Sequence, residues 1–245
     1  ISVWWISLIW SGFGIGRNQM SEVRKEIKYV VPIADFLSMK PQLLQIMKAD
    51  VNGEDGHYTV RSLYFDSIYD HDLNDNISGM MEKRKVRLRT YDPKLGRVRL
   101  EWKCKEGSDG RKFSFWISKE EAMGMIEGDF SFLEEREGSL EQTLYKRLLQ
   151  GCYLPKTIIE YQREAYSYPV SDTRITFDQS VRAVQGGLNF FEDELCGLPL
   201  IDESVGIFEI KYNDFVPYPI RQITSGIDRC AVANSKYTQA RLALI

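Results

Sequence analysis

The fold is decided by the stretch MEKRKVRLRTYDPKLGRVRLEWKCK, which covers residues 81 to 105. Side chains of an extended chain alternate between two faces. The first half therefore places four cations on one face, namely Lys83, Lys85, Arg87 and Arg89. The second half repeats the alternation with Arg99, Glu101, Lys103 and Lys105, and Pro93 and Gly96 between the halves predict a chain reversal. If these faces line the inside of a closed sheet they predict an anion site, and if they face water they form an ordinary amphipathic hairpin.

The composition narrows the class of ligand. The chain has 245 residues, of which 43% are hydrophobic and 27% charged, and its net charge is −3. A basic domain would be expected for general nucleic-acid binding, so we expect no nucleic-acid partner. Basic residues clustered within an acidic protein instead indicate a discrete site for a compact polyanion. The four cysteines have no metal-ligand spacing, and neither histidine lies near a Ser or Cys motif, so no zinc site, disulfide framework or nucleophilic triad is predicted.

Further strands with the same alternation are predicted over 22–29, 58–66, 111–117, 157–168, 174–178 and 207–212. Helices are predicted over 34–49, where Pro41 is expected to divide the helix, from the caps Ser118 and Ser139, over 217–227, and after Ser235. The Asp- and Asn-rich segment 69–79 is predicted to be a connection. Residues 1–19 are apolar but too short for a membrane span, and we expect an appendage outside the fold, with a membrane-surface anchor as the alternative. Residues 20–245 are then one domain.

About eight strands joined by short turns predict an α+β fold in which an antiparallel sheet closes into a barrel or tunnel with peripheral helices. For one isolated strand the solvent-facing orientation of a charged face is favoured. Repetition of cationic faces changes this, because a surface sheet usually mixes both charge signs. The faces collect Lys28, Lys85, Arg87, Arg89, Lys103, Arg163, Arg174 and Lys211. Burying unpaired cations is costly, so such a lumen would need water and a polyanionic ligand.

These residues occur in an order that resembles a known family. The segments are RKEIKY (24–29), RSLYFD (61–66), RLRTY (87–91), LEWK (100–103), YQR (161–163), RITFD (174–178), FEIKY (208–212) and SKY (235–237). None is specific alone, but the ordered set, which spans residues 22 to 240, resembles the VTC polyphosphate polymerase domain. That family belongs to the triphosphate tunnel metalloenzymes and is related to the CYTH enzymes.

The resemblance implies an ATP-dependent, metal-dependent polymerase that transfers the nucleotide γ-phosphoryl to a growing polyphosphate chain. It implies catalytic roles for Arg87, Arg89, Lys103, Arg163, Arg174 and Lys236, and phosphate or nucleotide binding by Lys28, Arg61, Lys85, Lys211 and Ser235. Glu209, and more weakly Glu26, would hold Mn²⁺ or Mg²⁺. Arg61 and Lys211 have a structural ion pair as their alternative, Lys211 with Glu101 or Glu26. ATP and polyphosphate are the implied partners. The spacing of the four cysteines indicates reduced thiols and so a cytoplasmic location, and association with a membrane through a protein partner follows from family analogy alone.

Two other functions stay open. CYTH hydrolases carry Glu-x-Glu-x-Lys on the first strand, whereas this chain has Arg24, Glu26 and Lys28 at the corresponding positions. Replacing the first acid by arginine removes a metal ligand and adds a cation, which favours a polymerase over a triphosphate hydrolase. The other alternative is a non-catalytic polyphosphate-binding module. Glu209 favours catalysis, because a pure binder gains nothing from a metal-binding carboxylate in a cationic tunnel.

Overall fold

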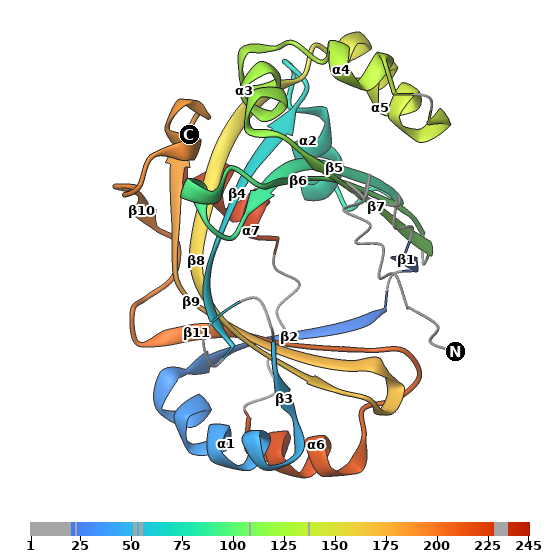
Figure 1. The fold of residues 1–245 in the computed structure, drawn as a ribbon. Helices are drawn as coiled ribbons and strands as arrows, with labels where there is room; N and C mark the ends of the chain where they lie inside the picture. The colour runs from blue at the N-terminus through green and yellow to red at the C-terminus, as the bar shows by residue number, and fades with distance from the viewer. Residues whose placement is uncertain are drawn as a thin grey trace, which may run out of the picture.

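One antiparallel sheet of eleven strands forms the body of the protein (Figure 1). The structure is a computed structural model that describes residues 21–22, 24–50, 53, 56–107, 109–136, 138–227 and 235–245, so the expectation for residues 1–19 lies outside the described residues. The strands are β1 (Ser21–Glu22), β2 (Lys25–Pro32), β3 (Lys48–Ala49), β4 (His57–Asp66), β5 (Glu82–Thr90), β6 (Val98–Glu106), β7 (Asp109–Ile117), β8 (Leu154–Tyr168), β9 (Thr173–Gln185), β10 (Leu198–Pro199) and β11 (Val205–Tyr212).

The sheet curls round a central space in the order β1-β7-β6-β5-β4-β8-β9-β11-β2, with β10 paired to β9 and β3 to β8. Two strands that follow each other in the sequence form the opposite ends of the sheet. β1 pairs with β7 at one end, and β2, which begins three residues after β1 ends, pairs with β11 at the other. The antiparallel α+β fold is thus as predicted. The barrel, however, is not closed by a continuous ladder. The strand number exceeds the expected eight because β1, β3 and β10 have two residues each, too few to show an alternation.

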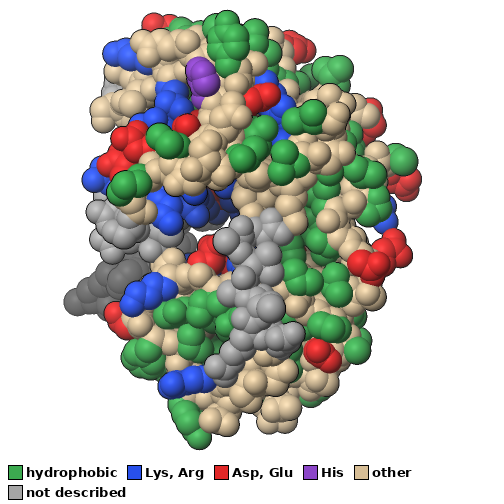
Figure 2. All heavy atoms as spheres, turned by 180° about the vertical axis from the view of Figure 1, so that it is seen from behind, with side chains coloured by type: hydrophobic (Ala, Val, Ile, Leu, Met, Phe, Trp, Pro, Cys, Tyr) green, Lys and Arg blue, Asp and Glu red, His purple; other side chains and the backbone are tan. Residues whose placement is uncertain are grey.

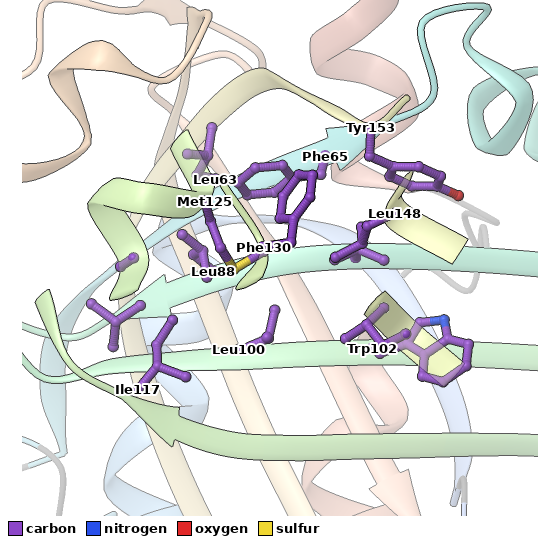
Figure 3. Close-up of a cluster of buried hydrophobic side chains, with 14 of the residues drawn as sticks. Leu63, Phe65, Leu88, Leu100, Trp102, Ile117, Met125, Phe130, Leu148 and Tyr153 are labelled. Carbon is purple, nitrogen blue, oxygen red and sulfur yellow. The ribbon is translucent and has the colours of Figure 1, made fainter. Parts of the chain in front are cut away.

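The hydrophobic core lies on the outside of the curled sheet. Helices α3 (Lys119–Glu127), α4 (Ser131–Glu134) and α5 (Ser139–Gln150) cover β5, β6 and β7, where Leu88, Leu100 and Trp102 meet Met125 and Leu148 (Figure 3). Helices α1 (Ile33–Ile46) and α6 (Tyr218–Ile223) cover the opposite wall, and Phe36 stacks on Phe177 with ring centroids 4.0 Å apart. Because apolar side chains occupy the outer face, the alternating charged side chains are directed inward.

Three local predictions need correction. Helix α1 continues through Pro41, which lies on its exposed side, where water can satisfy the carbonyl group that loses its partner. The segment 69–79 contains a helix, α2 (His71–Ile77), because the carboxylate of Asp66 accepts hydrogen bonds from the backbone N–H groups of Asp72 and Leu73 and so replaces a local cap. Ser118 forms the predicted capping box with Glu121, but α5 is capped by Gly138, and Ser139 is its first residue.

The last helix, α7 (Lys236–Leu244), begins with Ser235 as its cap and packs against β8, β9 and α2. Its Tyr237 ring stacks on Tyr64 of β4 at 5.1 Å, and the Tyr237 hydroxyl donates to Asp66 at 2.6 Å. These contacts hold the first residues of α7 next to the central space. None of the helices in the described ranges is both long and apolar enough to span a bilayer.

Candidate functional site

A cavity of about 320 Å³ occupies the inside of the curled sheet. Twelve of its lining side chains are lysine or arginine and three are glutamate. In the space-filling view an opening leads into the molecule, and Lys and Arg side chains gather at its rim (Figure 2). The lining residues are Arg24, Glu26, Lys28, Tyr64, Lys85, Arg87, Arg89, Tyr91, Arg99, Glu101, Lys103, Lys112, Tyr161, Arg163, Arg174, Thr176, Glu209, Lys211, Ser235 and Lys236.

All but one of the predicted site residues line this cavity. The exception is Arg61, which is 2% exposed and lies on the outer face of β4 with Leu63 and Phe65, whereas Tyr64 faces inward. Its guanidinium donates to Glu160 at 2.6 Å and to the backbone carbonyl groups of Phe190, Glu192 and Asp193. The structural alternative therefore describes the position of Arg61, and we drop it from the phosphate-binding set.

Glu101 organises one cationic group in the cavity wall. Its carboxylate accepts a hydrogen bond from Arg87 at 2.6 Å and forms ion pairs with Lys112 at 2.6 Å and Arg89 at 3.8 Å. Burial raises the pKa of the Glu101 carboxyl, but these three cations outweigh burial and hold the pKa well below its usual range. Glu101 is thus a fixed anion that orients cations from β5 and β7 toward the cavity.

Asp178 plays the same part on the opposite wall. Its carboxylate is fully buried and binds Arg163 in a bidentate pair of 2.6 and 2.8 Å, and Lys236 donates to it at 2.6 Å. Burial raises the pKa of Asp178, but Arg163 and Lys236 outweigh it and lower the pKa to about 2. This single carboxylate fixes a cation on β8 relative to one on α7.

A third group joins β2 to β11. The register sets Glu209 opposite Lys28 and Lys211 opposite Glu26. Glu26 is in contact with Lys28, Glu209 is in contact with Lys211, and Lys211 lies 3.6 Å from Glu26. The expected Lys211 pair with Glu26 is therefore present, whereas Glu101 pairs with other cations. On the adjacent strand β9, Arg174 pairs with Asp50 and its guanidinium lies 3.0 Å from the Tyr58 hydroxyl.

Lys85 and Lys103 face each other across β5 and β6. Neither has a carboxylate within ion-pair distance among the described residues, and Lys85 donates to the Ser235 hydroxyl at 2.8 Å. Burial, followed by the charges of Lys103, Lys28 and Arg87, lowers the pKa of Lys85 to about 7. Burial also lowers the pKa of Lys103, and it lowers that of Lys112 to about 8 although Glu101 opposes it. At these lysines, burial and repulsion within the cluster together therefore outweigh the attraction of the protein's own carboxylates.

Several residues that line the cavity were not predicted to be site residues: Arg24, Tyr64, Tyr91, Arg99, Glu101, Lys112, Tyr161 and Thr176. Lys112 could have been found, because it alternates with the outer-face residues Phe113 and Phe115 as the cations of β5 alternate with Val86 and Leu88. The tyrosines carried no comparable signal, since aromatic residues suit either face of a strand.

The carboxylates that line the cavity could supply only some of the ligands of a divalent ion. Glu209 and Glu26 lie on neighbouring strands, but the described residues contain no group of three His, Cys, Asp or Glu side chains that could hold a metal by themselves. Mg²⁺ is commonly bound through one or two protein carboxylates with the remaining oxygens from substrate phosphates and water. The carboxylate pair therefore fits an ion that binds together with a phosphate ligand.

The fold is shared with two solved proteins of low sequence identity. A candidate adenylate cyclase from Bacillus halodurans aligns over 87% of this chain and 94% of its own, with 15% identity and a TM-score of 0.55. HpAC1, a candidate adenylyl cyclase from Hippeastrum whose dominant activity is that of a triphosphatase, aligns over 91% of this chain and 96% of its own, with 15% identity and a TM-score of 0.53. No curated protein matches the sequence.

The sequence itself matches a family model described as the VTC domain over residues 23–245, which includes every strand of the curled sheet from β2 onward and all the residues that line the cavity. The chain therefore belongs to the VTC domain family, and its cation-lined cavity lies inside a triphosphate tunnel fold.

Proposed function

We propose that this protein is a polyphosphate polymerase that transfers the γ-phosphoryl group of ATP to the end of an inorganic polyphosphate chain held in the cavity. The observation that carries the proposal is the excess of cations over carboxylates around a cavity of about 320 Å³. A linear polyphosphate carries regularly spaced negative charge, so it matches cations supplied by seven strands and by the start of α7. The arginines offer planar forks for phosphate oxygens, and the lysines offer point charges.

Phosphoryl transfer of this kind asks for positioning and charge stabilisation more than for a protein nucleophile. The acceptor is a terminal phosphate oxygen, which is already anionic, so no strong general base is required. Arg87, Arg89 and Arg163 are held in place by Glu101 and Asp178, and this preorganisation supports a role in stabilising charge on the transferred group. Lys103, Arg174 and Lys236 line the same space and complete the proposed catalytic set, with Lys28, Lys85, Lys211 and Ser235 as proposed phosphate ligands.

A divalent cation is part of the proposal. Glu209, with Glu26 beside it, would hold Mn²⁺ or Mg²⁺, and the ion would neutralise charge on the nucleotide phosphates when bound. Burial raises the pKa of Glu209, but Lys211, Lys28 and Arg163 outweigh it, so the group is a carboxylate at neutral pH and is ready to bind a cation. A ligand-bound ion would compete with Lys211 for this carboxylate.

Hydrolysis of a triphosphate is the competing function. HpAC1, whose dominant activity is that of a triphosphatase, has the same fold, and this supports hydrolysis as the alternative. In the present chain Arg24, where CYTH hydrolases have an acid, lines the cavity and lies 2.9 Å from Asp172. With a cation there, fewer carboxylates are available to bind metal and to orient an attacking water. This supports transfer to phosphate over transfer to water. The non-catalytic binding module is the second alternative.

The decisive assay incubates the purified chain with ATP and Mn²⁺, with and without a short polyphosphate primer. We expect ADP together with a polymer that acid and an exopolyphosphatase degrade. Release of inorganic phosphate without polymer would establish the hydrolase instead. Tight polyphosphate binding with no consumption of ATP would leave only the binding module.

The metal assignment has its own test in the variant Glu209→Gln, with Glu26→Gln as the matched control. The change removes one negative charge from the cavity and keeps the side-chain volume. We expect Glu209→Gln to lose about a hundredfold or more in Mn²⁺-dependent turnover, while metal-free tripolyphosphate binding is preserved or tighter. Glu26→Gln should lose less. Equal turnover of Glu209→Gln and wild type across a Mn²⁺ titration would remove Glu209 from the metal site.

ATP and polyphosphate are the proposed partners. Nucleic acid is not among them, because the net charge of −3 does not suit general nucleic-acid binding and the cations line a cavity rather than an exposed surface. A cytoplasmic location is proposed because the cysteines have no disulfide-framework spacing, and a membrane-protein partner is proposed from family analogy alone.

A further inference from the structure

Thr176 differs from most residues of the cavity wall because its buried hydroxyl has no hydrogen-bond partner among the described residues. The residue is 2% exposed and lines the cavity, and its Oγ1 atom has no hydrogen-bond partner in the part of the chain that the structure describes. Most buried hydroxyl groups in proteins are hydrogen-bonded, and one left unsatisfied costs stability. Valine has nearly the same shape and would avoid this cost, so the hydroxyl calls for an explanation.

The position of Thr176 relates it to the proposed site. It lies on β9 between Arg174 and Asp178, and strand alternation turns all three side chains to the same face. Three residues form a row across the sheet, in which Glu209 on β11 lies between Thr176 on β9 and Lys28 on β2. On the remaining side Thr176 faces Ala165, which has no polar side-chain atom.

The neighbours of Thr176 in the ligand-free cavity are already engaged with each other. Glu209 is in contact with Lys211, and Arg163 is held by Asp178. A hydroxyl directed into this space can donate one hydrogen bond to an incoming acceptor, and the surrounding cations favour an anionic acceptor.

We propose that the Thr176 hydroxyl donates a hydrogen bond to a phosphate oxygen of the bound triphosphate or polyphosphate, next to Glu209. It would be an uncharged phosphate ligand among charged ones, and it would fix the position of one phosphate group along the row without adding another positive charge to the cavity wall. This inference rests on the proposed function, since it assumes that a chain of phosphates occupies the cavity.

The test compares Thr176→Val with Thr176→Ser. Binding of tripolyphosphate is measured by isothermal titration calorimetry in EDTA, so that neither turnover nor metal contributes. A hydrogen bond to a charged acceptor is substantial, so we expect Thr176→Val to bind about tenfold more weakly, and Thr176→Ser, which keeps the hydroxyl, to bind within about threefold of wild type. The melting temperature of ligand-free Thr176→Val should equal or exceed that of wild type, because the substitution removes an unsatisfied buried hydroxyl.

Several outcomes would overturn the assignment. Equal affinity of Thr176→Val and wild type would show that the hydroxyl does not contact phosphate. Equal weakening in both variants would assign the effect to packing, and a loss confined to titrations with Mn²⁺ alone would make Thr176 a metal ligand. Absence of tripolyphosphate binding in the wild-type chain would overturn the proposed function as well, whereas wild-type binding with no Thr176→Val effect would overturn this inference only.

Discussion

Replacing Lys85 by methionine is expected to make the ligand-free protein more stable to heat and to lower its turnover about a hundredfold or more. Methionine keeps most of the length of the side chain and removes the charge. The two effects have opposite signs because burial and neighbouring cations disfavour the ammonium group of Lys85, whereas bound phosphates would attract it. A residue that only maintained the fold would lose stability and activity together.

The gain in stability follows from the pKa of Lys85, which is about 7 in the folded protein against an ordinary 10.5. Between about pH 7 and pH 10.5 the unfolded chain binds the Lys85 proton more tightly than the folded chain does, so the charge on Lys85 destabilises the fold. The penalty is fully present below about pH 7 and disappears as the pH rises toward 10.5. The melting temperature of Lys85→Met should therefore exceed that of wild type by a few degrees at about pH 6.5, and the difference should shrink by about pH 9.5.

The matched control is Lys83→Met, on the same face of the same strand but one step outside the cavity lining. This variant should keep its melting temperature and most of its activity, because Lys83 does not line the cavity and follows the exposed Glu82 at the start of β5. A Lys85→Met variant that melts at or below the wild-type temperature at about pH 6.5 would contradict the view that burial and neighbouring cations destabilise the charge on this lysine.

The sequence predicted the faces of the strands well, because alternation is a local property. It placed twelve site residues that the structure brings into one cavity, from Lys28 on β2 to Lys236 on α7. Arg61 is the one predicted site residue that does not line the cavity. The residue belongs to a strand with tyrosine and serine on the inner face and leucine and phenylalanine on the outer one, and its parity with Leu63 and Phe65 places it outside. Its partner Glu160 and the carbonyl groups around it are about a hundred residues away in sequence or more, so only the folded chain reveals them.

The roles of the carboxylates were the least predictable part of the site. Asp178 and Glu101 alternate correctly with their neighbours, but nothing local indicates that each would bind cations from other elements. Cross-strand register decides the pairs within the sheet, and the packing of α7 on the sheet brings Lys236 to Asp178. Thr176 is a similar case, because its lack of a partner among the described residues depends on three neighbouring strands and not on its own segment.

Binding of tripolyphosphate at about pH 7.5 is expected to take up protons. Three lysines of the empty cavity have lowered pKa values: Lys85 at about 7, Lys112 at about 8, and Lys103 below its ordinary value. An anion placed among them favours their charged forms and raises all three pKa values. Between the free and the bound pKa of each lysine the complex holds more protons than the free protein, so affinity should fall as the pH rises above about 7, by up to about tenfold per pH unit for each lysine that titrates.

Calorimetric titrations in buffers with different ionisation enthalpies measure this uptake directly. Lys85→Met should take up fewer protons than wild type, whereas Lys83→Met should match wild type, and protonation of the ligand itself cancels in these comparisons because it is common to all three proteins. If Lys85→Met takes up as many protons as wild type, the phosphates bind away from Lys85, and the cluster at β5 and β6 is not their site. A reduced uptake confined to Lys85→Met would place the anion among the lysines whose pKa values burial and mutual repulsion lower.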